Sequence, residues 1–310
     1  MDISIIIVNY NVKEYIISCI ESIYKHSKPN INFEIIIVDN NSEDDSVINI
    51  KKKFPKIHLI ENHFNRGFSS AVNQGTEICS GEFLLILNPD TLFIEDSLNK
   101  LIRYAKKQND LGVLGPALIS KNGSIQQSFW RDPSIINTLL SLTHLDYFNF
   151  KKNYNKRKAD KPMEVDTISG GALFLKKEVF IKLNGFNDDL FWMEDIDLCV
   201  RLRKLEFKVI YFPETKIIHF VGKSAKTNYL ITISNQLISK IKYFKIHHNK
   251  LSVSFILFLV LFVSLIKLIF LLSLLPFSST YRMKFIAYFY TFRKIILKWI
   301  FHVKVKSQTQ

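Results

Sequence analysis

The sequence predicts an α/β fold, with a mostly parallel, Rossmann-like sheet flanked by helices. Short apolar runs recur at residues 3–8, 33–38, 57–60 and 83–87, and each ends at polar or turn-forming residues. Such runs are typical of strands that are buried on both faces. The segments between them have the apolar spacing of amphipathic helices, so we expect repeated βα units that connect right-handedly into one sheet.

The elements of this half of the chain can be assigned in order. Residues 3–8 are rich in β-branched side chains, and Asn9-Tyr10-Asn11 then leads into a helix that ends near His26. The second strand ends in Asp39-Asn40-Asn41-Ser42, where Ser42 or a neighbouring Asp can cap the next helix. Further helices are expected at about residues 69–79 and 91–107, and a later strand at residues 208–212.

The composition indicates a cytoplasmic catalytic domain with reduced cysteines and a basic C-terminal segment. The formal charge is +14, and residues 251–310 carry eight of the 42 Lys and Arg residues but none of the 28 acids. The three cysteines, Cys19, Cys79 and Cys199, lack metal-ligand spacing, which favours buried thiols in a cytoplasmic domain. The first residues run straight into a strand, so we expect no signal peptide.

A carboxylate follows the fourth predicted strand. Asp90 comes directly after the strand and the turn dipeptide Asn88-Pro89. Ligands of open α/β sheets bind at the carboxyl edge, so Asp90 is placed to hold a metal ion against a phosphate; capping of the next helix is the alternative. The loop after the first strand lacks G-x-G-x-x-G, which argues against a nicotinamide cofactor. A Walker loop is absent as well.

A set of motifs occurs in a fixed order over residues 2–225. Together they resemble the inverting family 2 glycosyltransferases, most closely the rhamnosyltransferase-like branch, and this implies a GT-A fold and a nucleotide-diphospho-sugar donor. The motifs are Ser4-Ile-Ile-Ile-Val-Asn-Tyr-Asn11, Val38-Asp-Asn-Asn-Ser42, Asn62-x-x-Asn65-x-Gly67-Phe68 with Ala71-x-Asn73-x-Gly75, Leu87-Asn-Pro-Asp90, Gly170-Gly-Ala172, residues 185–201 with Glu194-Asp195, and His219-Phe-Val-Gly-Lys-Ser224.

The resemblance implies where the donor binds. Asp39 corresponds to the family's first acidic residue, which accepts a hydrogen bond from N3–H of uracil or thymine; an Asx-turn is the other role open to it. Arg66 would lie across the base or near phosphate, and Gly67 would let the backbone close in, unless it is only a turn glycine. The expected donor-binding residues are Asn9, Asn11, Asp39, Asn65, Arg66, Gly67, Asn88 and Asp90.

A divalent cation is expected because the departing diphosphate is negatively charged. The family's Asp-x-Asp signature is Asn88-Pro89-Asp90 in this chain, so an amide replaces one carboxylate and weakens the charge of the site. Asp90 is the expected ligand. His219 resembles the family's late histidine, which closes on the diphosphate or the metal, with a structural role as the alternative; Gly222 and Ser224 follow it. Mg²⁺ or Mn²⁺ suits such a site better than Zn²⁺.

Inversion requires a carboxylate that takes the proton of the acceptor hydroxyl. Glu194, Asp195 and Asp197 are candidates. On a helix, at about 100° per residue, Asp195 falls among apolar residues, while Asp197 can pair with Arg201 on the solvent side. A carboxylate facing inward costs stability unless it is used, so Asp195 is the expected catalytic base, kept ionised by the helix dipole. N-capping is the alternative.

The acceptor is expected to bind above the same edge. Gly170 and Gly171 permit close approach of a sugar, Trp130 and Trp192 offer aromatic platforms unless they only pack in the core, and Glu194 completes the expected acceptor set. Residues 134–161 carry six basic residues and have the composition of a mobile loop that meets an acidic lipid diphosphate or the membrane surface, or is only solvated. The six are Lys151, Lys152, Lys156, Arg157, Lys158 and Lys161.

The end of the chain predicts membrane attachment. Residues 252–275 contain one charge, Lys267, and are long enough to span a bilayer as a helix. Basic residues flank both sides, which one crossing cannot reconcile with the positive-inside rule, so the segment either spans or dips in with residues 285–303 along the interface. We expect attachment to the anionic cytoplasmic face of the inner membrane. Nucleic-acid binding is not expected, because these basic residues are interleaved with apolar ones.

These observations predict a GT-A domain at residues 1–230, with a nucleotide-sugar half (1–110) and an acceptor half (111–230), followed by a membrane-attachment region at residues 231–310. The expected activity is transfer of one sugar, rhamnose from dTDP-rhamnose by resemblance, to a lipid-linked saccharide of a bacterial surface polysaccharide. The alternatives are another donor (a UDP-hexose or a GDP-sugar) or a non-catalytic membrane-bound scaffold that binds nucleotide sugars. A processive synthase lacks support because Gln-x-x-Arg-Trp is absent, and a sugar nucleotidyltransferase because its glycine-rich basic loop is absent.

Overall fold

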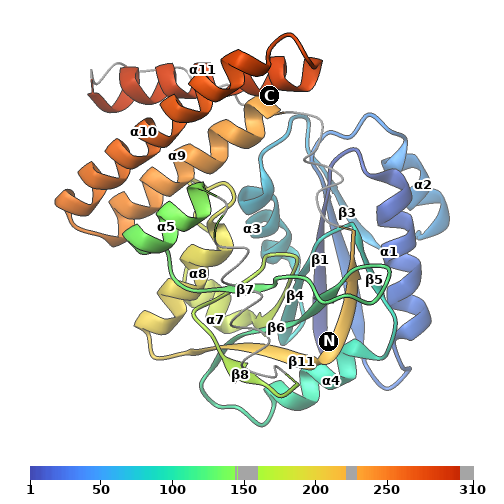
Figure 1. Ribbon diagram of the computed structural model, residues 1–310. Coiled ribbons are helices and arrows are strands. Elements are labelled where there is room, and N and C mark those ends of the chain that lie inside the picture. Colours follow the sequence, from blue (N-terminus) through green and yellow to red (C-terminus); the bar gives the residue numbers. More distant parts are fainter. Residues whose placement is uncertain (144, 146–159, 221–228, 301–310) are drawn as a thin grey trace. The chain divides into compact units, whose positions relative to one another are not determined.

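The computed structural model describes residues 1–143, 145, 160–220 and 229–300, and the chain divides into two compact units (Figure 1). Unit 1 comprises Met1–Asp132, Phe150–Asp188 and Glu194–Ser224. Unit 2 comprises Pro133–Asn149, Asp189–Met193 and Ala225–Gln310.

Unit 1 is built on a nine-stranded sheet in the order β3-β2-β1-β4-β10-β6-β11-β5, with β8 paired to β11. The four strands predicted in the first half are present and run parallel, which confirms the α/β prediction. Strand β10 runs antiparallel between β4 and β6, and β6 is parallel to β11. The strands are β1 (Ile3–Asn9), β2 (Phe33–Asp39), β3 (His58–Glu61), β4 (Phe83–Leu87), β5 (Thr91–Phe93), β6 (Leu111–Ile119), β8 (Met163–Glu164), β10 (Ala172–Lys176) and β11 (Lys208–His219), with β7 (Phe129–Trp130) and β9 (Thr167–Ile168) forming a separate pair.

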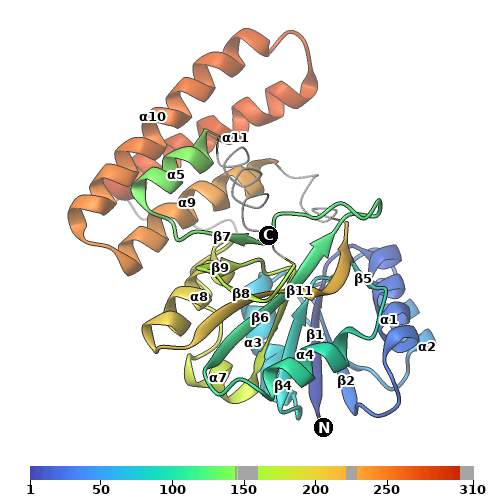
Figure 2. The same cartoon turned by 60° about the horizontal axis from the view of Figure 1, so that its bottom comes forward.

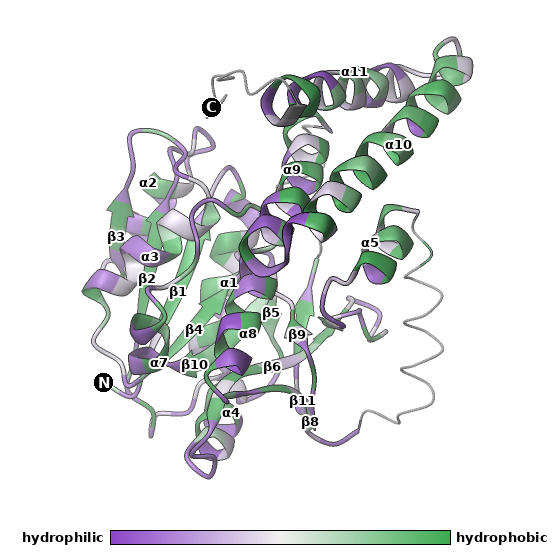
Figure 3. Ribbon diagram, turned by 90° about the vertical axis from the view of Figure 1, so that its left-hand side faces the viewer, coloured by the Kyte–Doolittle hydropathy of each residue, from purple (hydrophilic) through white to green (hydrophobic). Residues whose placement is uncertain are grey.

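Helices cover both faces of the sheet (Figure 2). Alternate residues of β1 point to opposite faces, so Ile5 packs in the same apolar cluster as α1 and α4, while Ile6 packs in the cluster of α3, α7 and α8. Figure 3 shows hydrophobic residues along the central strands, as expected for a sheet buried on both sides. The helices of unit 1 are α1 (Lys13–His26), α2 (Ser46–Lys53), α3 (Phe68–Ile78), α4 (Ser97–Ala105), α7 (Lys177–Lys182) and α8 (Glu194–Lys204).

Local predictions failed in three places. Residues 134–161, expected to form a loop, contain helix α5 (Ile135–Leu142). The helix expected at residues 91–107 begins only at Ser97, because Thr91–Phe93 forms β5 and pairs with the end of β11. Asp90 therefore does not cap that helix. Ser42 does not cap α2, since its hydroxyl accepts the Asn11 N–H instead. Of the neighbouring Asp residues that were the alternative, Asp45 occupies the N-cap position and Asp44 Oδ1 accepts the Ser46 N–H at 3.2 Å. The prediction of buried, unbonded cysteines is confirmed.

Unit 2 contains α5 (Ile135–Leu142), α9 (Tyr229–His247), α10 (Lys250–Leu274), α11 (Ser279–Ile295) and a π-helical turn, η1 (Ile296–Ile300). By length and composition, α10 is the one helix of the described residues that is apolar enough to cross a membrane. Helix α11 packs against both α9 and α10. Lys151, Lys152, Lys156, Arg157 and Lys158 of the expected basic loop, Gly222, Ser224 and residues 301–303 lie outside the described residues.

Phe174 tests the packing of this sheet. Its side chain is fully buried in β10 and stacks on Phe83 with ring centroids 5.1 Å apart. Phe174→Ala should lower the free energy of unfolding by about 3–5 kcal/mol, because it leaves a cavity at the centre of the sheet. Urea unfolding followed by far-UV circular dichroism measures this loss. Ile181→Ala, at a position that is 54% exposed, is the control and should change it by less than about 0.5 kcal/mol.

Candidate active site

The ends of β1 and β2 hold Asp39 in place. Asn9 and Asp39 are paired in register and are buried, and Asn9 Nδ2 donates to Asp39 Oδ1 at 2.6 Å. Asp39 Oδ2 accepts the Ser42 N–H at 2.9 Å, which is the local turn that the sequence left open. A carboxylate oxygen has more than one lone pair, so Asp39 can hold this turn and still accept a hydrogen bond from a ligand.

The loop after β1 is tied to the loop after β2. Asn11 has a positive φ of 53°, and its Oδ1 accepts the Glu43 N–H at 2.7 Å. Its own N–H donates to Ser42 Oγ at 3.0 Å. The Asn11 side chain therefore joins two loops, and Asn9 Nδ2 bonds Asp39, Ser42 and Ser46.

The loop after β3 reaches the same edge of the sheet. The Asn62 N–H donates to the Asp39 carbonyl at 2.9 Å, and Asn40 Nδ2 donates to the Gly67 carbonyl at 3.2 Å. Asn65 Oδ1 accepts the Gly67 N–H at 2.9 Å, at a glycine whose φ of +83° disfavours other residues. Arg66 lies between them and is exposed to solvent. The three loops expected to bind the donor therefore come together.

Asp90 and His219 are also brought together. Asp90 is 5% exposed, and its Oδ1 lies 3.3 Å from His219 Nε2. Asn88 Nδ2 lies 3.4 Å from the same ring nitrogen. His219 is the last residue of β11 and is paired with Thr91 of β5, so the short strand missed by the sequence prediction is what brings His219 beside Asp90.

Gln126 orients His219, and no sequence motif indicated it. Gln126 Nε2 donates to the His219 carbonyl at 2.7 Å, and Gln126 Oε1 lies 3.3 Å from His219 Nδ1. With the Nδ1 proton directed at Gln126, Nε2 faces Asp90 either protonated or with a lone pair for a cation. In the described residues no group of three or more His, Cys, Asp or Glu could hold a metal. The cation donors here are one carboxylate, one imidazole and an amide.

Gly170 and Gly171 join this pair to Asp195. The Gly171 carbonyl accepts the Asn88 N–H at 3.0 Å, and the Gly170 N–H donates to Asp195 Oδ2 at 2.7 Å. A Cβ on Gly171 would lie 2.9 Å from a Leu118 methyl carbon and 3.4 Å from His219 Cε1, so a side chain there would press on both residues. Asp90 and Asp195 therefore lie at one edge, linked through His219 and the two glycines.

The carboxyl group of Asp195 is poised near neutral pH. Burial raises its pKa from 3.8 to about 6, and the Gly170 and Ile196 N–H groups only partly oppose this. Loss of solvation thus outweighs the hydrogen bonds that favour the ionised form, although a pKa of about 6 still leaves the carboxyl group mostly ionised at neutral pH. The two N–H groups each hold one oxygen and so fix the orientation of the carboxylate.

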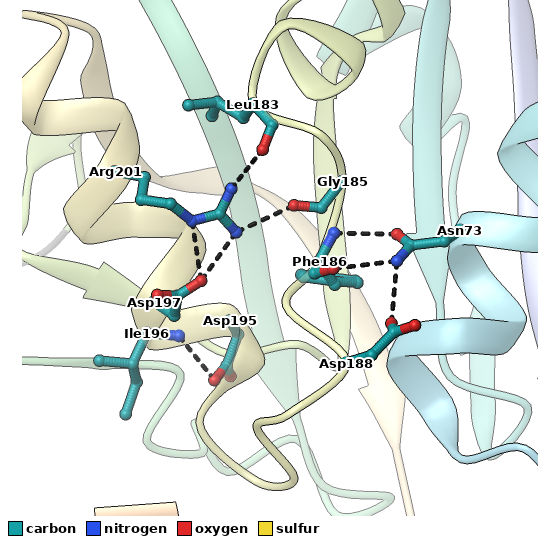
Figure 4. A network of polar contacts seen from close by, with 9 residues as sticks. All are labelled: Asn73, Leu183, Gly185, Phe186, Asp188, Asp195, Ile196, Asp197 and Arg201. Atoms are coloured by element: carbon teal, nitrogen blue, oxygen red, sulfur yellow. Dashed lines mark hydrogen bonds and ion pairs between the residues drawn. The ribbon is translucent and has the colours of Figure 1, made fainter. Parts of the chain in front are cut away.

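Asp197 and Arg201 form the predicted pair, but not at the solvent surface. Asp197 is 0% exposed, and its Oδ2 accepts from Arg201 Nε at 2.8 Å. The Arg201 guanidinium also donates to the carbonyls of Leu183 and Gly185 (Figure 4). The pair therefore anchors the loop that follows α7, a role that helical spacing alone did not reveal.

Asn73 of α3 holds the same loop from the other side. Its side chain accepts the Phe186 N–H and donates to the Phe186 carbonyl, both at 2.9 Å, and donates to Asp188 Oδ1 at 3.0 Å (Figure 4). Gly185 has a φ of +68°, and a Cβ there would lie 2.3 Å from Asn73 Oδ1. Arg201 and Asn73 thus fix the loop after α7 up to Asp188, where this segment of unit 1 ends.

The remaining expected acceptor residues are spread over both units. Trp130 of β7 is half-buried, and its carbonyl accepts from the Thr167 hydroxyl. Glu194 is the half-buried first residue of α8, next to Asp195. Trp192 belongs to unit 2 and is 42% exposed, with a positive φ of 75°.

Comparison with known proteins indicates the family. The model of the family described as glycosyl transferase family 2 matches residues 4–183, and that of the N-terminal domain of galactosyltransferase matches residues 151–223. The N-acetylglucosaminyl-diphospho-decaprenol L-rhamnosyltransferase of Mycobacterium tuberculosis is 25% identical over 206 residues, covering 61% of this chain and 67% of that protein. The poly(ribitol-phosphate) beta-glucosyltransferase of Bacillus spizizenii is 33% identical over 116 residues, covering 36% of this chain and 18% of that protein.

A solved structure shares the fold. The mannosyltransferase of Pyrobaculum calidifontis in complex with GDP-Man and Mn²⁺ superimposes with a TM-score of 0.56 at 17% identity, covering 97% of this chain and 88% of that one. This likeness concerns the fold alone. The chain spans about two thirds of the length of the mycobacterial relative.

Asp195 and Asp197 should respond to the same substitution with changes in stability of different size. Asp195→Asn removes a charge that burial disfavours, but its Nδ2 then faces one of the two backbone N–H groups that each hold a carboxylate oxygen. The two effects oppose each other, so the free energy of unfolding at pH 8 should change by less than about 1 kcal/mol. At pH 5 the wild-type carboxyl group is itself protonated, so the variant should be less stable relative to the wild type there than at pH 8. Asp197→Asn leaves Arg201 without its carboxylate and should lower the same free energy by about 3 kcal/mol.

Urea titrations at pH 8 and pH 5 measure both changes. Equal losses of stability in the two variants would show that the two carboxylates occupy equivalent environments, against the structure.

Proposed function

Because the chain belongs to glycosyl transferase family 2 and has a GT-A fold, we propose that it is a metal-dependent inverting glycosyltransferase. It would move one sugar from a nucleotide-diphospho-sugar to a lipid-linked saccharide of a bacterial surface polysaccharide. One observation carries the proposal. Asp90 lies 3.3 Å from His219 Nε2, the nearby Asn88 N–H donates to the Gly171 carbonyl, and the Gly170 N–H donates to Asp195, so two carboxyl groups lie near one sheet edge. In an inverting transfer, one such group can hold the cation while the other takes the proton of the acceptor hydroxyl.

The donor that we propose is dTDP-rhamnose. Asp39 would accept the N3–H of thymine, and the loop with Asn65, Arg66 and Gly67 would cover the base and phosphates. The sequence resemblance to the rhamnosyltransferase-like branch and the mycobacterial relative, an L-rhamnosyltransferase by name, support this sugar. A UDP-hexose or a GDP-sugar is the alternative.

Asp90, His219 and the Asn88 amide fit a divalent cation, Mg²⁺ or Mn²⁺. His219 Nε2 and Asp90 Oδ1 already lie 3.3 Å apart, and Gln126 contacts the other ring nitrogen, Nδ1, and so orients the ring. The set is short of ligands by itself, which suits a cation that takes its other positions from phosphate oxygens and water. When bound, the cation would neutralise charge on the departing diphosphate.

Asp195 is the proposed base. The acceptor hydroxyl oxygen forms a bond to the anomeric carbon on the face opposite the nucleotide, and its proton passes to the carboxylate of Asp195. The bond from that carbon to the diphosphate oxygen breaks, and its electron pair leaves with the nucleotide diphosphate. A pKa of about 6 leaves Asp195 ionised at neutral pH and still basic enough to take a proton.

Unit 2 is the proposed membrane-attachment region on the cytoplasmic face. Helix α11 folds back along α10: Lys267 of α10 donates to the Tyr288 hydroxyl of α11 at 3.1 Å, and Lys245 near the end of α9 lies 5.6 Å from the Trp299 ring centroid of η1. The two ends of the hairpin are therefore on one side, and the turn between the helices exposes Phe277 at 76%. We propose that the hairpin dips into the cytoplasmic leaflet and does not cross the bilayer.

Asp195→Asn tests the base. Transfer of rhamnose from dTDP-rhamnose to a short-chain prenyl-diphospho-N-acetylglucosamine, followed by mass spectrometry, should be at least 100-fold slower than in the wild type, because no group takes the proton. The wild-type rate should fall as the pH drops below about 6, where Asp195 is protonated. Glu178→Gln, at an exposed acid of α7, is the control. Equal rates in Asp195→Asn and wild type, at equal folded fraction, would refute catalysis by this residue.

Asp90→Asn tests the cation. In the wild type, EDTA should weaken dTDP binding at least tenfold and Mn²⁺ should restore it, because the cation would bridge the protein and the diphosphate. Asp90→Asn should bind dTDP weakly with or without Mn²⁺, as measured by isothermal titration calorimetry. A wild-type affinity that does not change with EDTA would contradict a cation at this site.

A further inference from the structure

A cavity of about 270 Å³ lies within unit 2, and of the residues discussed above, Trp192, Lys267 and Tyr288 line it. Its volume is just below the range of about 300–1,000 Å³ that holds drug-sized ligands, so it suits a small group. The lining residues with polar groups are Ser141 of α5, Trp192, Gln236 and Lys240 of α9, Lys267 of α10 and Tyr288 of α11. Donors from five segments of the chain thus face one space.

The electrostatic character of the cavity is positive. None of its described lining residues is acidic, whereas two are lysines. Lys240 Nζ lies 3.2 Å from the Ser141 hydroxyl and Lys267 Nζ lies 3.1 Å from the Tyr288 hydroxyl, so neutral groups position both ammonium ions. Residues 225–310 contain thirteen Lys and Arg residues and no Asp or Glu. An anion is the ligand that such a field attracts.

Lys267 is the more informative of the two lysines. It lies about two thirds of the way along α10, an apolar helix whose residues Ile266 and Ile269 are 50% and 65% exposed. A charged residue within such a helix is unfavourable unless it has a partner or a function, and Lys267 is paired with the Tyr288 hydroxyl and also lines the cavity. A ligand with an anionic head and a long apolar tail would satisfy both the lysine and the exposed apolar surface of the same helix.

The segment Asp189–Met193 connects the cavity to Asp195 along the chain. It is fastened to α9 at two points, where the Phe191 N–H donates to Ser239 Oγ at 3.1 Å and Lys242 Nζ donates to the Asp189 carbonyl at 2.6 Å. Between these points and α8, Trp192 adopts a positive φ of 75°, which residues other than glycine rarely do, and lines the cavity. Asp195 follows three residues later, so a short stretch of chain joins the cavity-lining Trp192 to the proposed base.

We propose that this cavity binds the diphosphate of a prenyl-diphosphate-linked acceptor, with Lys240 and Lys267 as its cationic ligands. This inference rests on the proposed transfer to a lipid-linked saccharide and names the part of that acceptor which unit 2 recognises. The prenyl chain would follow the exposed apolar residues of α10 into the membrane. Free diphosphate and phospholipid headgroups share part of this chemistry, and the test separates them.

The test measures binding of farnesyl diphosphate to the full chain in detergent micelles by isothermal titration calorimetry. Lys240→Gln/Lys267→Gln should weaken binding at least tenfold, because each lysine contributes a charge-assisted hydrogen bond. The matched control Lys245→Gln/Lys250→Gln removes one exposed lysine from α9 and one from α10 outside the cavity, and should stay within twofold of wild type. Farnesol, which lacks the anion, should not bind measurably.

Three results would overturn the proposal. They are an unchanged affinity in Lys240→Gln/Lys267→Gln, inorganic pyrophosphate binding as tightly as farnesyl diphosphate, and loss of farnesyl diphosphate binding when phosphatidylglycerol is added to the micelles in tenfold excess.

Titration with dTDP and Mn²⁺ distinguishes this proposal from the proposed function. A Lys240→Gln/Lys267→Gln variant that loses farnesyl diphosphate but keeps wild-type dTDP affinity supports a separate cavity for the lipid diphosphate. If the wild type binds farnesyl diphosphate through these lysines yet transfers no sugar, the cavity stands and the transferase assignment falls.

Discussion

The reversed direction of β10 is the constraint on which the candidate active site depends. In an all-parallel sheet every strand would bring its carboxyl end to this edge, but β10 runs antiparallel between β4 and β6, with Ala172 opposite Leu87. The residues that enter β10 are therefore beside the residues that leave β4. Gly170 and Gly171 occupy this point, and without side chains their backbone can bond Asn88 on one side and Asp195 on the other.

Two carboxylates in the first turn of α8 show how environment separates the roles of like residues. Asp197 has a cation within hydrogen-bonding distance, and the pair is tied to two backbone carbonyls, so its charge is compensated and serves structure. Asp195 instead accepts backbone N–H groups, including those of Gly170 and Ile196, and burial raises its pKa to about 6. The fold keeps this less favourable arrangement, which is expected where a group is needed for function and not for stability.

The sequence was sufficient for the features that depend on local pattern. The first four strands, helices α1, α3 and α8, and the placing of Asp39, Asp90 and Asp195 at element ends follow from apolar periodicity and short motifs. It failed where the structure depends on pairing between residues that are far apart in the sequence. Residues 91–93 have helical spacing but pair with a strand more than a hundred residues later, and that pairing brings His219 to Asp90. Gln126 belongs to no motif and could be found only once its contacts with His219 were known.

Asp197 illustrates a second limit of sequence reasoning. Helical spacing correctly paired it with Arg201, yet assigned the pair to solvent because both residues are charged. What buries them is the loop between α7 and α8, whose carbonyls need donors and whose path Asn73 fixes from the other side. Periodicity reports the angle of a residue about its helix axis, and it cannot report that another segment covers that angle.

The same reasoning applies to α10, where composition alone could not choose between a crossing helix and a dipping one. The choice depends on α11, because a helix that folds back and reaches α9 returns the chain to the side from which α10 started. Lys267 fits this arrangement, since the Tyr288 hydroxyl meets its ammonium group inside the hairpin. A single crossing helix would leave that charge to the hydrocarbon, at a cost of at least about 2.5 kcal/mol. The proposal of a dipping hairpin therefore rests on the contacts that α11 makes with α9 and α10.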